Sequence, residues 1–167
     1  MNKRLTKIEL AKQRMSFAAG HFTIFSESDR ENLHGHNYAV FVMFEAEVGD
    51  NGMTADYNVY KNAVMDCCQW LDEVVLLPTE SPYLEIEETE THVYAYFNKR
   101  TEKMQFLKRD VKLLPVRNIT VEELSYWFLN KLIPMAKDSQ EHPIHSIEVK
   151  IFSGQGQSGS STWSKNP

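Results

Sequence analysis

Apolar and polar residues alternate along much of the first third of the chain, with the period of two that is typical of β-strands. The segment Leu33–Val48 shows this pattern most clearly, and both of its faces are largely apolar until it turns acidic at its end. It predicts a strand that is buried on both faces. Extended stretches between about Ile8 and Ile24 predict one or two earlier strands. The loop Thr23–Arg30 would let the two regions pair in antiparallel fashion.

Two later segments have the three- and four-residue spacing of amphipathic helices. The first runs from about Tyr57 to Leu71 and follows Asp56, a suitable N-cap residue. The second begins near Thr120 and Glu123, whose spacing is that of a capping box, and its apolar stripe is expected to end at Pro134. We expect both helices to cover a sheet.

The remaining segments complete the predicted fold. His145–Phe152 predicts a last strand, and the Gly-, Ser- and Gln-rich stretch Ser153–Trp163 predicts a loop or a short edge segment. Apolar residues scattered among many charges predict an inserted hairpin at about residues 83–107. The order of elements predicts one α+β domain over residues 1–167, in which two helices lie on one face of an antiparallel four-stranded sheet.

Composition restricts the class of protein. A chain of 167 residues with 42% apolar and 25% charged residues suits a single globular domain. Its net charge of −5 argues against nucleic acid or an anionic membrane as a partner, because both require a basic surface. The N-terminus is charged and no apolar run is long enough to cross a membrane, so we expect a cytoplasmic protein. Cys67 and Cys68 lie in the first predicted helix and are expected to be free thiols.

Three histidines form a candidate metal site. His34 and His36 are two residues apart on the predicted strand, so their side chains point to the same face. His21 ends the earlier extended stretch and would join them if the two stretches pair. Three imidazoles with a fourth position open are how a catalytic zinc is held. Taken alone, however, a His-x-His pair is more often a chance pair of surface histidines.

The residues around these histidines carry a family resemblance. Phe17–His21 followed by Leu33–Tyr38 resembles the zinc-binding signature of the 6-pyruvoyl-tetrahydropterin synthase family, which includes 6-carboxytetrahydropterin synthase. The resemblance continues over nearly the whole chain, at Trp70–Asp72, Leu76–Thr79, Asn118–Glu122 and Gly156–Ser158. It implies the tunnelling fold and a Zn²⁺ site at His21, His34 and His36. It also implies a homo-oligomer, a trimer or hexamer, whose active sites are shared between neighbouring chains.

The same resemblance suggests the catalytic base. Most family members have a cysteine a few residues before the His-Gly-His motif, whereas this chain has Arg30 and Glu31 there. Such a pair is similar to the family type that removes the side chain of 7,8-dihydroneopterin for folate synthesis. The chemistry agrees, because zinc lowers the pKa of a bound hydroxyl and a nearby carboxylate can accept its proton as a carbon–carbon bond breaks. Without the histidines, Glu31 would be interpreted as a loop residue paired with Arg30.

Two positions depart from the family pattern. Asp72 is followed by Glu73 where the family usually has a histidine, so both are candidate catalytic residues but the imidazole relay is lost. Ser153 falls where the family has the glutamate that grips the pterin, and Thr120 and Glu122 join it as candidate substrate-binding residues. Losing that charged contact would cost about 1.5–3 kcal/mol of binding free energy unless a residue such as Glu122 replaces it.

Three functions therefore remain open. The first is a zinc-dependent lyase of the pterin side chain, acting on 7,8-dihydroneopterin or its triphosphate in folate or queuosine biosynthesis, with Glu31 as general base. The second is a divergent family member that acts on a non-pterin substrate. The third is a non-catalytic member that binds zinc or a small heterocycle.

Overall fold

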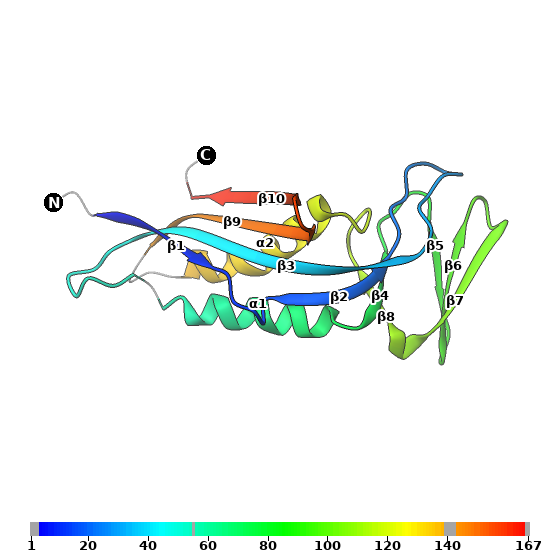
Figure 1. The fold of residues 1–167 in the computed structure, drawn as a ribbon, viewed down its shortest axis with the longest axis horizontal. Helices are drawn as coiled ribbons and strands as arrows, with labels where there is room; N and C mark the ends of the chain where they lie inside the picture. Colours follow the sequence, from blue (N-terminus) through cyan, green and yellow to red (C-terminus); the bar gives the residue numbers. More distant parts are fainter. Residues whose placement is uncertain (1–3, 55, 139–142, 166–167) are drawn as a thin grey trace.

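Two helices, two sheets and a short 3-10 turn make up the chain in a computed structural model that describes residues 4–54, 56–138 and 143–165 (Figure 1). The elements in chain order are β1 (Leu5–Leu10), β2 (Ser16–His21), β3 (His34–Glu47), α1 (Asn58–Leu71), β4 (Val74–Pro78), β5 (Glu85–Glu88), β6 (His92–Phe97), β7 (Glu102–Leu107), η1 (Lys108–Asp110), β8 (Val111–Leu114), α2 (Val121–Asp138), β9 (Ile144–Gly154) and β10 (Gln157–Ser164). The α+β class predicted from the sequence is confirmed.

The larger sheet has seven strands in the order β10-β9-β3-β2-β4-β8, and β1 pairs with the C-terminal half of β3. Its neighbours β2, β4 and β8 run parallel to one another, so the sheet is mixed and not the four-stranded antiparallel sheet that we predicted. The sequence did not predict β4 and β8, because each is a run of only four or five residues without polar alternation.

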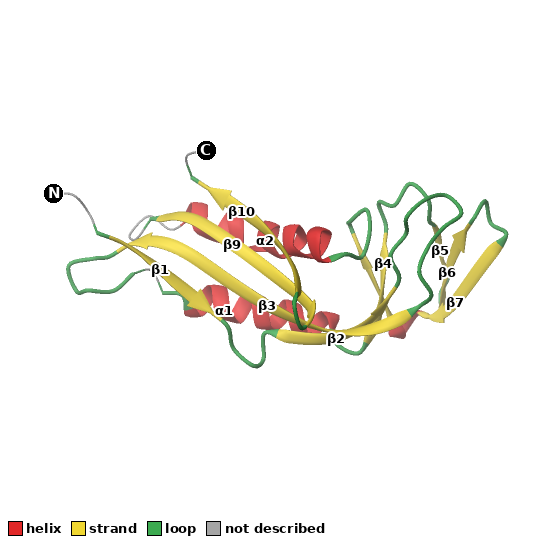
Figure 2. Ribbon diagram, turned by 45° about the horizontal axis from the view of Figure 1, so that its top comes forward, coloured by secondary structure: helices red, strands yellow, loops and turns green. Residues whose placement is uncertain are grey.

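Both helices cover the same face of this sheet (Figure 2). The residues of β3 that point toward them are at most 2% exposed, and these are Tyr38, Val40, Val42, Phe44 and Ala46. The opposite face is open, since Phe41 keeps 41% of its surface exposed. The prediction that this strand is buried on both faces is therefore wrong. Neither described helix is long and apolar enough to span a membrane.

The start of α2 follows the predicted capping signal, but its end does not. The Thr120 hydroxyl accepts a hydrogen bond from the Glu123 backbone N–H at 3.4 Å. The helix then continues past Pro134 to Asp138, so the prediction that it stops at Pro134 is wrong. Pro134 lies on the exposed side about one turn from the end, where a missing N–H removes a single hydrogen bond.

The insertion between β4 and β8 is a three-stranded antiparallel sheet, β5-β6-β7, where the sequence predicted a hairpin. We call it the inserted sheet. One of its faces carries Val93, Ala95 and Phe97 into a second apolar core that also contains Phe22 and Leu77. This core joins the inserted sheet to the segment that follows β2.

The C-terminal stretch predicted as a loop or short edge segment is the eight-residue strand β10, paired antiparallel with β9. Its residues are small and polar, so its sequence lacks the apolar alternation that marks a strand. Gly159 lets β10 pass close to the start of α2, because a Cβ at that position would lie 3.0 Å from Val121. This contact brings the last two strands beside the N-terminus of α2.

Candidate metal centre and active site

The pairing of β2 with β3 brings three histidines together. In the register of this pair, His21 lies opposite His34 and Ala19 lies opposite His36. The His21 ring centroid is 4.6 Å from that of His34 and 5.1 Å from that of His36. One nitrogen from each ring lies within 4.8 Å of the others, and the Nε2 atoms of His34 and His36 are 3.1 Å apart.

Hydrogen bonds set the orientation of two of these rings. The Nδ1 of His21 bonds the Ile119 carbonyl at 2.9 Å, and the Nδ1 of His34 bonds the Asn32 carbonyl at 2.8 Å. An Nδ1–H that donates to a carbonyl leaves Nε2 with a free lone pair, which is the arrangement typical of metal-ligating histidines. Burial lowers the pKa of His21 to about 4, and the neighbouring His34 acts in the same direction.

These three residues fit zinc. Four-coordinate zinc binds imidazole nitrogens at about 2.0–2.1 Å, so two such nitrogens in a tetrahedral site lie about 3.3 Å apart. The His34–His36 distance is close to that value. The Nε2 of His21 is buried and has no hydrogen-bond partner among the residues that the structure describes. A buried acceptor without a partner is costly unless a ligand satisfies it.

Glu31 lies beside this cluster. Its Oε2 accepts a hydrogen bond from the Thr23 backbone N–H at 2.9 Å, and its own backbone N–H donates to the Thr23 carbonyl at the same distance. The same Oε2 is 4.0 Å from the Nε2 of His34. Partial burial raises the pKa of the Glu31 carboxyl, but the hydrogen bonds from Thr23 and the charges of His34 and His21 together outweigh this effect, and the net pKa is lowered.

A cavity of about 280 Å³ opens next to the histidines. The predicted site residues that line it are His21, Glu31, His36, Thr120, Glu122 and Ser153. Six further residues that we did not assign to the site also line it, namely Thr23, Phe25, Tyr38, Ile119, Val121 and Gln157. Tyr38 was detectable, because it is two residues after His36 on the same strand and must point to the same face. Phe25 lies in a loop that has no periodicity to reveal it.

Asp72 and Glu73 do not line the histidine cavity. The Oδ1 of Asp72 accepts a hydrogen bond from the Ala18 backbone N–H at 2.7 Å at the end of α1. Glu73 lines a different cavity of about 410 Å³, which reaches the histidine cluster only through His36. Within one chain the structure therefore does not bring these two carboxylates to Glu31. Their catalytic assignment stays a prediction.

The two cysteines are poor candidates for a reactive thiolate. Both lie in α1 and are free. Burial raises the pKa of the Cys68 thiol to about 12 and raises that of Cys67 as well. Thiolate reactivity requires the opposite shift. Neither cysteine lines the cavity beside the histidines.

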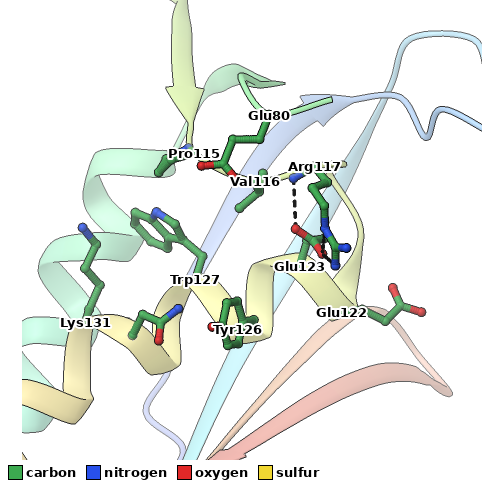
Figure 3. A pocket seen from close by; sticks show the side chains of 10 residues that line it. Glu80, Pro115, Val116, Arg117, Glu122, Glu123, Tyr126, Trp127 and Lys131 are labelled. Carbon is green, nitrogen blue, oxygen red and sulfur yellow. Dashed lines mark hydrogen bonds and ion pairs between the residues drawn. The ribbon is translucent and has the colours of Figure 1, made fainter. Parts of the chain in front are cut away.

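A larger cavity, of about 660 Å³, lies along the outer side of α2 (Figure 3). It is bordered by the Arg117–Glu123 ion pair, with 2.6 Å between Nη2 and Oε1, and by Trp127 and Tyr126. Arg117 is bound to Glu123 and its side chain is 75% exposed, so this ion pair is a surface contact. Glu122 lines both this cavity and the histidine cavity, and in Figure 3 its carboxylate points away from the ion pair.

An α+β fold that places a three-histidine cluster and a carboxylate beside a cavity defines a class of protein with a candidate metal site. Comparison with protein families identifies it further. Residues 10–158 match the family model described as 6-pyruvoyl tetrahydropterin synthase. This match covers most of the chain, and the chain belongs to the 6-pyruvoyl tetrahydropterin synthase family.

Individual relatives support the same family assignment. A protein of Methanocaldococcus jannaschii, provisionally named a 6-carboxy-5,6,7,8-tetrahydropterin synthase, is 29% identical over 144 residues, which are 86% of each chain. The 6-pyruvoyl tetrahydropterin synthase of Plasmodium vivax superposes with a TM-score of 0.86 at 25% identity, over 96% of this chain and 99% of that one. The Plasmodium falciparum enzyme gives the same TM-score at 26% identity, over 98% of this chain and 99% of that one.

Proposed function

We propose that this protein is a zinc-dependent lyase of the pterin side chain that acts on 7,8-dihydroneopterin or its triphosphate, with Glu31 as general base. One observation carries the proposal: the Oε2 of Glu31 lies 4.0 Å from the Nε2 of His34, at the edge of the three-histidine cluster. A carboxylate in this position can accept a proton from a group that lies against the metal site.

Each residue of the site has a role in this reaction. His21, His34 and His36 would hold the Zn²⁺. When bound, zinc would lower the pKa of a substrate hydroxyl group and orient it. Glu31 accepts the hydroxyl proton as the adjacent carbon–carbon bond breaks, the hydroxyl carbon leaves as an aldehyde, and the electron pair passes into the dihydropterin ring. The side-chain carbon that stays on the ring then takes up a proton, which gives the hydroxymethyl product. The hydrogen bond from Thr23 holds the carboxylate in its ionised, proton-accepting form.

The solved relatives support a glutamate in this role. Two further structures of the P. vivax enzyme, with the same TM-score of 0.86, carry substitutions of a glutamate that is described as its catalytic residue. Glu31 is the glutamate that lines the histidine cavity together with Glu122. Of these two, Glu31 is the one that lies within 4.0 Å of a histidine nitrogen.

The substrate's ring is proposed to bind against Thr120, Glu122 and Ser153, which line the same cavity. Ser153 favours the alternative that the enzyme has moved to a non-pterin heterocycle, because a serine cannot make the bidentate charged contact of a carboxylate. The third possible function is a non-catalytic protein that binds zinc or a heterocycle. Asp72 and Glu73 are proposed to act on the site of a neighbouring subunit, since they lie apart from Glu31 within one chain.

Assembly into a cytoplasmic homo-oligomer, a trimer or hexamer, is also proposed. Among the residues that the structure describes, strand β10 is paired on one side only, by β9, so its other backbone edge is open to a further strand. The face of the large sheet that the helices do not cover carries Phe41, whose ring lies 5.0 Å from that of Phe152. Open edges and apolar rings on an uncovered face both favour association of subunits.

Product analysis tests the proposed reaction. The zinc-loaded protein is incubated with 7,8-dihydroneopterin and with its triphosphate, and the products are separated by chromatography and identified by mass. We expect release of 6-hydroxymethyl-dihydropterin from at least one of the two substrates, and much slower release by Glu31→Gln. If neither compound is converted or bound by the zinc-loaded protein, the pterin lyase proposal is wrong.

A further inference from the structure

The side chain of Arg30 connects the candidate catalytic loop to the inserted sheet. Its Nη2 donates to the Oε2 of Glu102 on β7 at 2.7 Å, and its Nη1 donates to the backbone carbonyl of Glu31 at 2.9 Å. The guanidinium carbon lies 5.2 Å from the centroid of the Phe22 ring and 5.5 Å from that of Phe97. One side chain therefore contacts the loop, the second apolar core and the inserted sheet.

Arg30 is well protected from solvent, whereas its partner Glu102 keeps 42% of its side chain exposed. The Arg30 side chain is only 18% exposed, and two aromatic rings lie against its planar group. Screening by water is weaker at such a site than at an exposed ion pair, so its geometry is better defined. The guanidinium can donate to two acceptors at once in a fixed plane, which an ammonium group on a flexible stem does less well.

The backbone of Glu31 is consequently held at two points. Its N–H donates to the Thr23 carbonyl, and its carbonyl accepts from Arg30. With both ends of the residue fixed, the carboxylate is directed to the Thr23 N–H and toward His34. Glu102 fixes Arg30 in turn from the inserted sheet.

We propose that Arg30 is a positioning residue for Glu31, and that the inserted sheet holds it in place through Glu102. Arg30 is not among the described residues that line the histidine cavity, and its effect passes through the Glu31 backbone. This inference rests on the proposed function only for its kinetic consequence. The positional claim concerns the order of the loop and is measurable without turnover.

A second ion pair between the same two parts provides a matched control. Lys99, in the turn between β6 and β7, lies 3.4 Å from Glu27 in the same loop. Both side chains are well exposed, at 73% and 57%, and their ion pair does not include Arg30. Glu102→Ala and Glu27→Ala therefore each remove one carboxylate that links the loop to the inserted sheet, but only the first releases Arg30.

The positional claim is tested by hydrogen–deuterium exchange of the peptide that spans residues 22–33, analysed by mass spectrometry. We expect faster exchange in Glu102→Ala and in Arg30→Lys, because the Thr23 and Glu31 amides lose their ordered partners.

Two further variants serve as controls. Glu102→Gln keeps an oxygen acceptor and should show a smaller change in exchange, and Glu27→Ala should match the wild type. Melting temperature and zinc content show that each variant is folded. Wild-type exchange in Glu102→Ala, or an equal acceleration in Glu27→Ala, would overturn the proposal.

Steady-state kinetics with the substrate that the wild-type protein converts tests the consequence. We expect kcat to fall on the order of ten- to hundredfold in Glu102→Ala with little change in KM, because the catalytic group is misplaced while the ring contacts remain. Faster exchange combined with a wild-type kcat would overturn the positioning role. A wild-type protein that converts no pterin while Glu102→Ala still exchanges faster would overturn the lyase proposal and support the positional claim.

Discussion

His21 and His34 lie directly opposite each other on neighbouring antiparallel strands, with ring centroids 4.6 Å apart, although thirteen positions separate them in the sequence. This pairing depends on the register of β2 against β3. A slip of one residue would send one of the two side chains to the other face of the sheet. The strand ladder therefore builds the candidate metal centre, and the loop between the strands brings Glu31 beside it.

The first prediction concerns the metal. Replacing His21, His34 or His36 with Ala should weaken zinc binding by more than 100-fold, because a lost ligand costs more than the 10- to 100-fold typical of a lost outer partner. Zinc is measured by elemental analysis after dialysis and by competition with a chelator. His92→Ala is the control, since this histidine lies on β6 outside the cluster. Full zinc occupancy in the triple substitution would refute the site.

The second prediction separates Glu31 from the cysteines. Glu31→Gln should lower kcat by about 100-fold or more, the range of general base catalysis, while zinc stays bound. The double variant Cys67→Ala, Cys68→Ala should keep kcat, because burial raises the pKa of the Cys68 thiol to about 12 and neither thiol lines the cavity. Alanine is chosen because burying a serine hydroxyl in place of the thiol would cost free energy unless it found a hydrogen-bond partner. Loss of turnover in the cysteine variant with an intact fold would contradict the assignment.

The third prediction concerns recognition of the ring. If the ligand is a pterin, Ser153→Glu should tighten its binding by about ten- to hundredfold, because a carboxylate can accept two charge-assisted hydrogen bonds from the ring's N–H edge. Calorimetric titration with 7,8-dihydroneopterin measures the change, and Ser153→Ala serves as the control for removing the hydroxyl alone. Weaker binding in Ser153→Glu would indicate a ligand with a different edge, since the new charge would then be buried without a partner.

The fourth prediction concerns Tyr38, a buried residue of the cavity. Its hydroxyl has no hydrogen-bond partner among the described residues, whereas the buried Ser125 hydroxyl bonds both the Glu122 carbonyl and Ser161 at 2.8 Å. Tyr38→Phe should leave the free energy of unfolding of the zinc-free protein unchanged or raise it by about 1 kcal/mol, and Ser125→Ala should lower it by about 1 kcal/mol. Urea unfolding measures both.

A clear loss of stability in Tyr38→Phe would show that its hydroxyl has a structural partner. In the zinc-loaded protein, a ligand bound in the cavity can form a hydrogen bond with the Tyr38 hydroxyl. We expect Tyr38→Phe to weaken ligand binding there even though it does not destabilise the free protein. Wild-type affinity for the ligand would mean that the hydroxyl does not face it.

The sequence by itself determined the local features of this protein. The two-residue spacing of His34 and His36 fixes a shared face, and the capping pair Thr120 and Glu123 fixes the start of α2, since both depend only on neighbouring residues. The apolar periodicity likewise located β3 and both helices. The motif residues before and within β3 were sufficient to indicate the family and the three histidines.

The tertiary structure decided what depends on contacts between distant segments. The parallel strands β4 and β8 and the edge strand β10 are held by their neighbours, so their short or polar sequences carry little signal. The Ile119 carbonyl reaches the His21 ring across 98 positions of sequence, and Ser153 reaches the same cavity from the end of β9. The separation of Asp72 from Glu31, and the link from Glu102 to the Glu31 loop, follow from packing of whole elements, which no local pattern encodes.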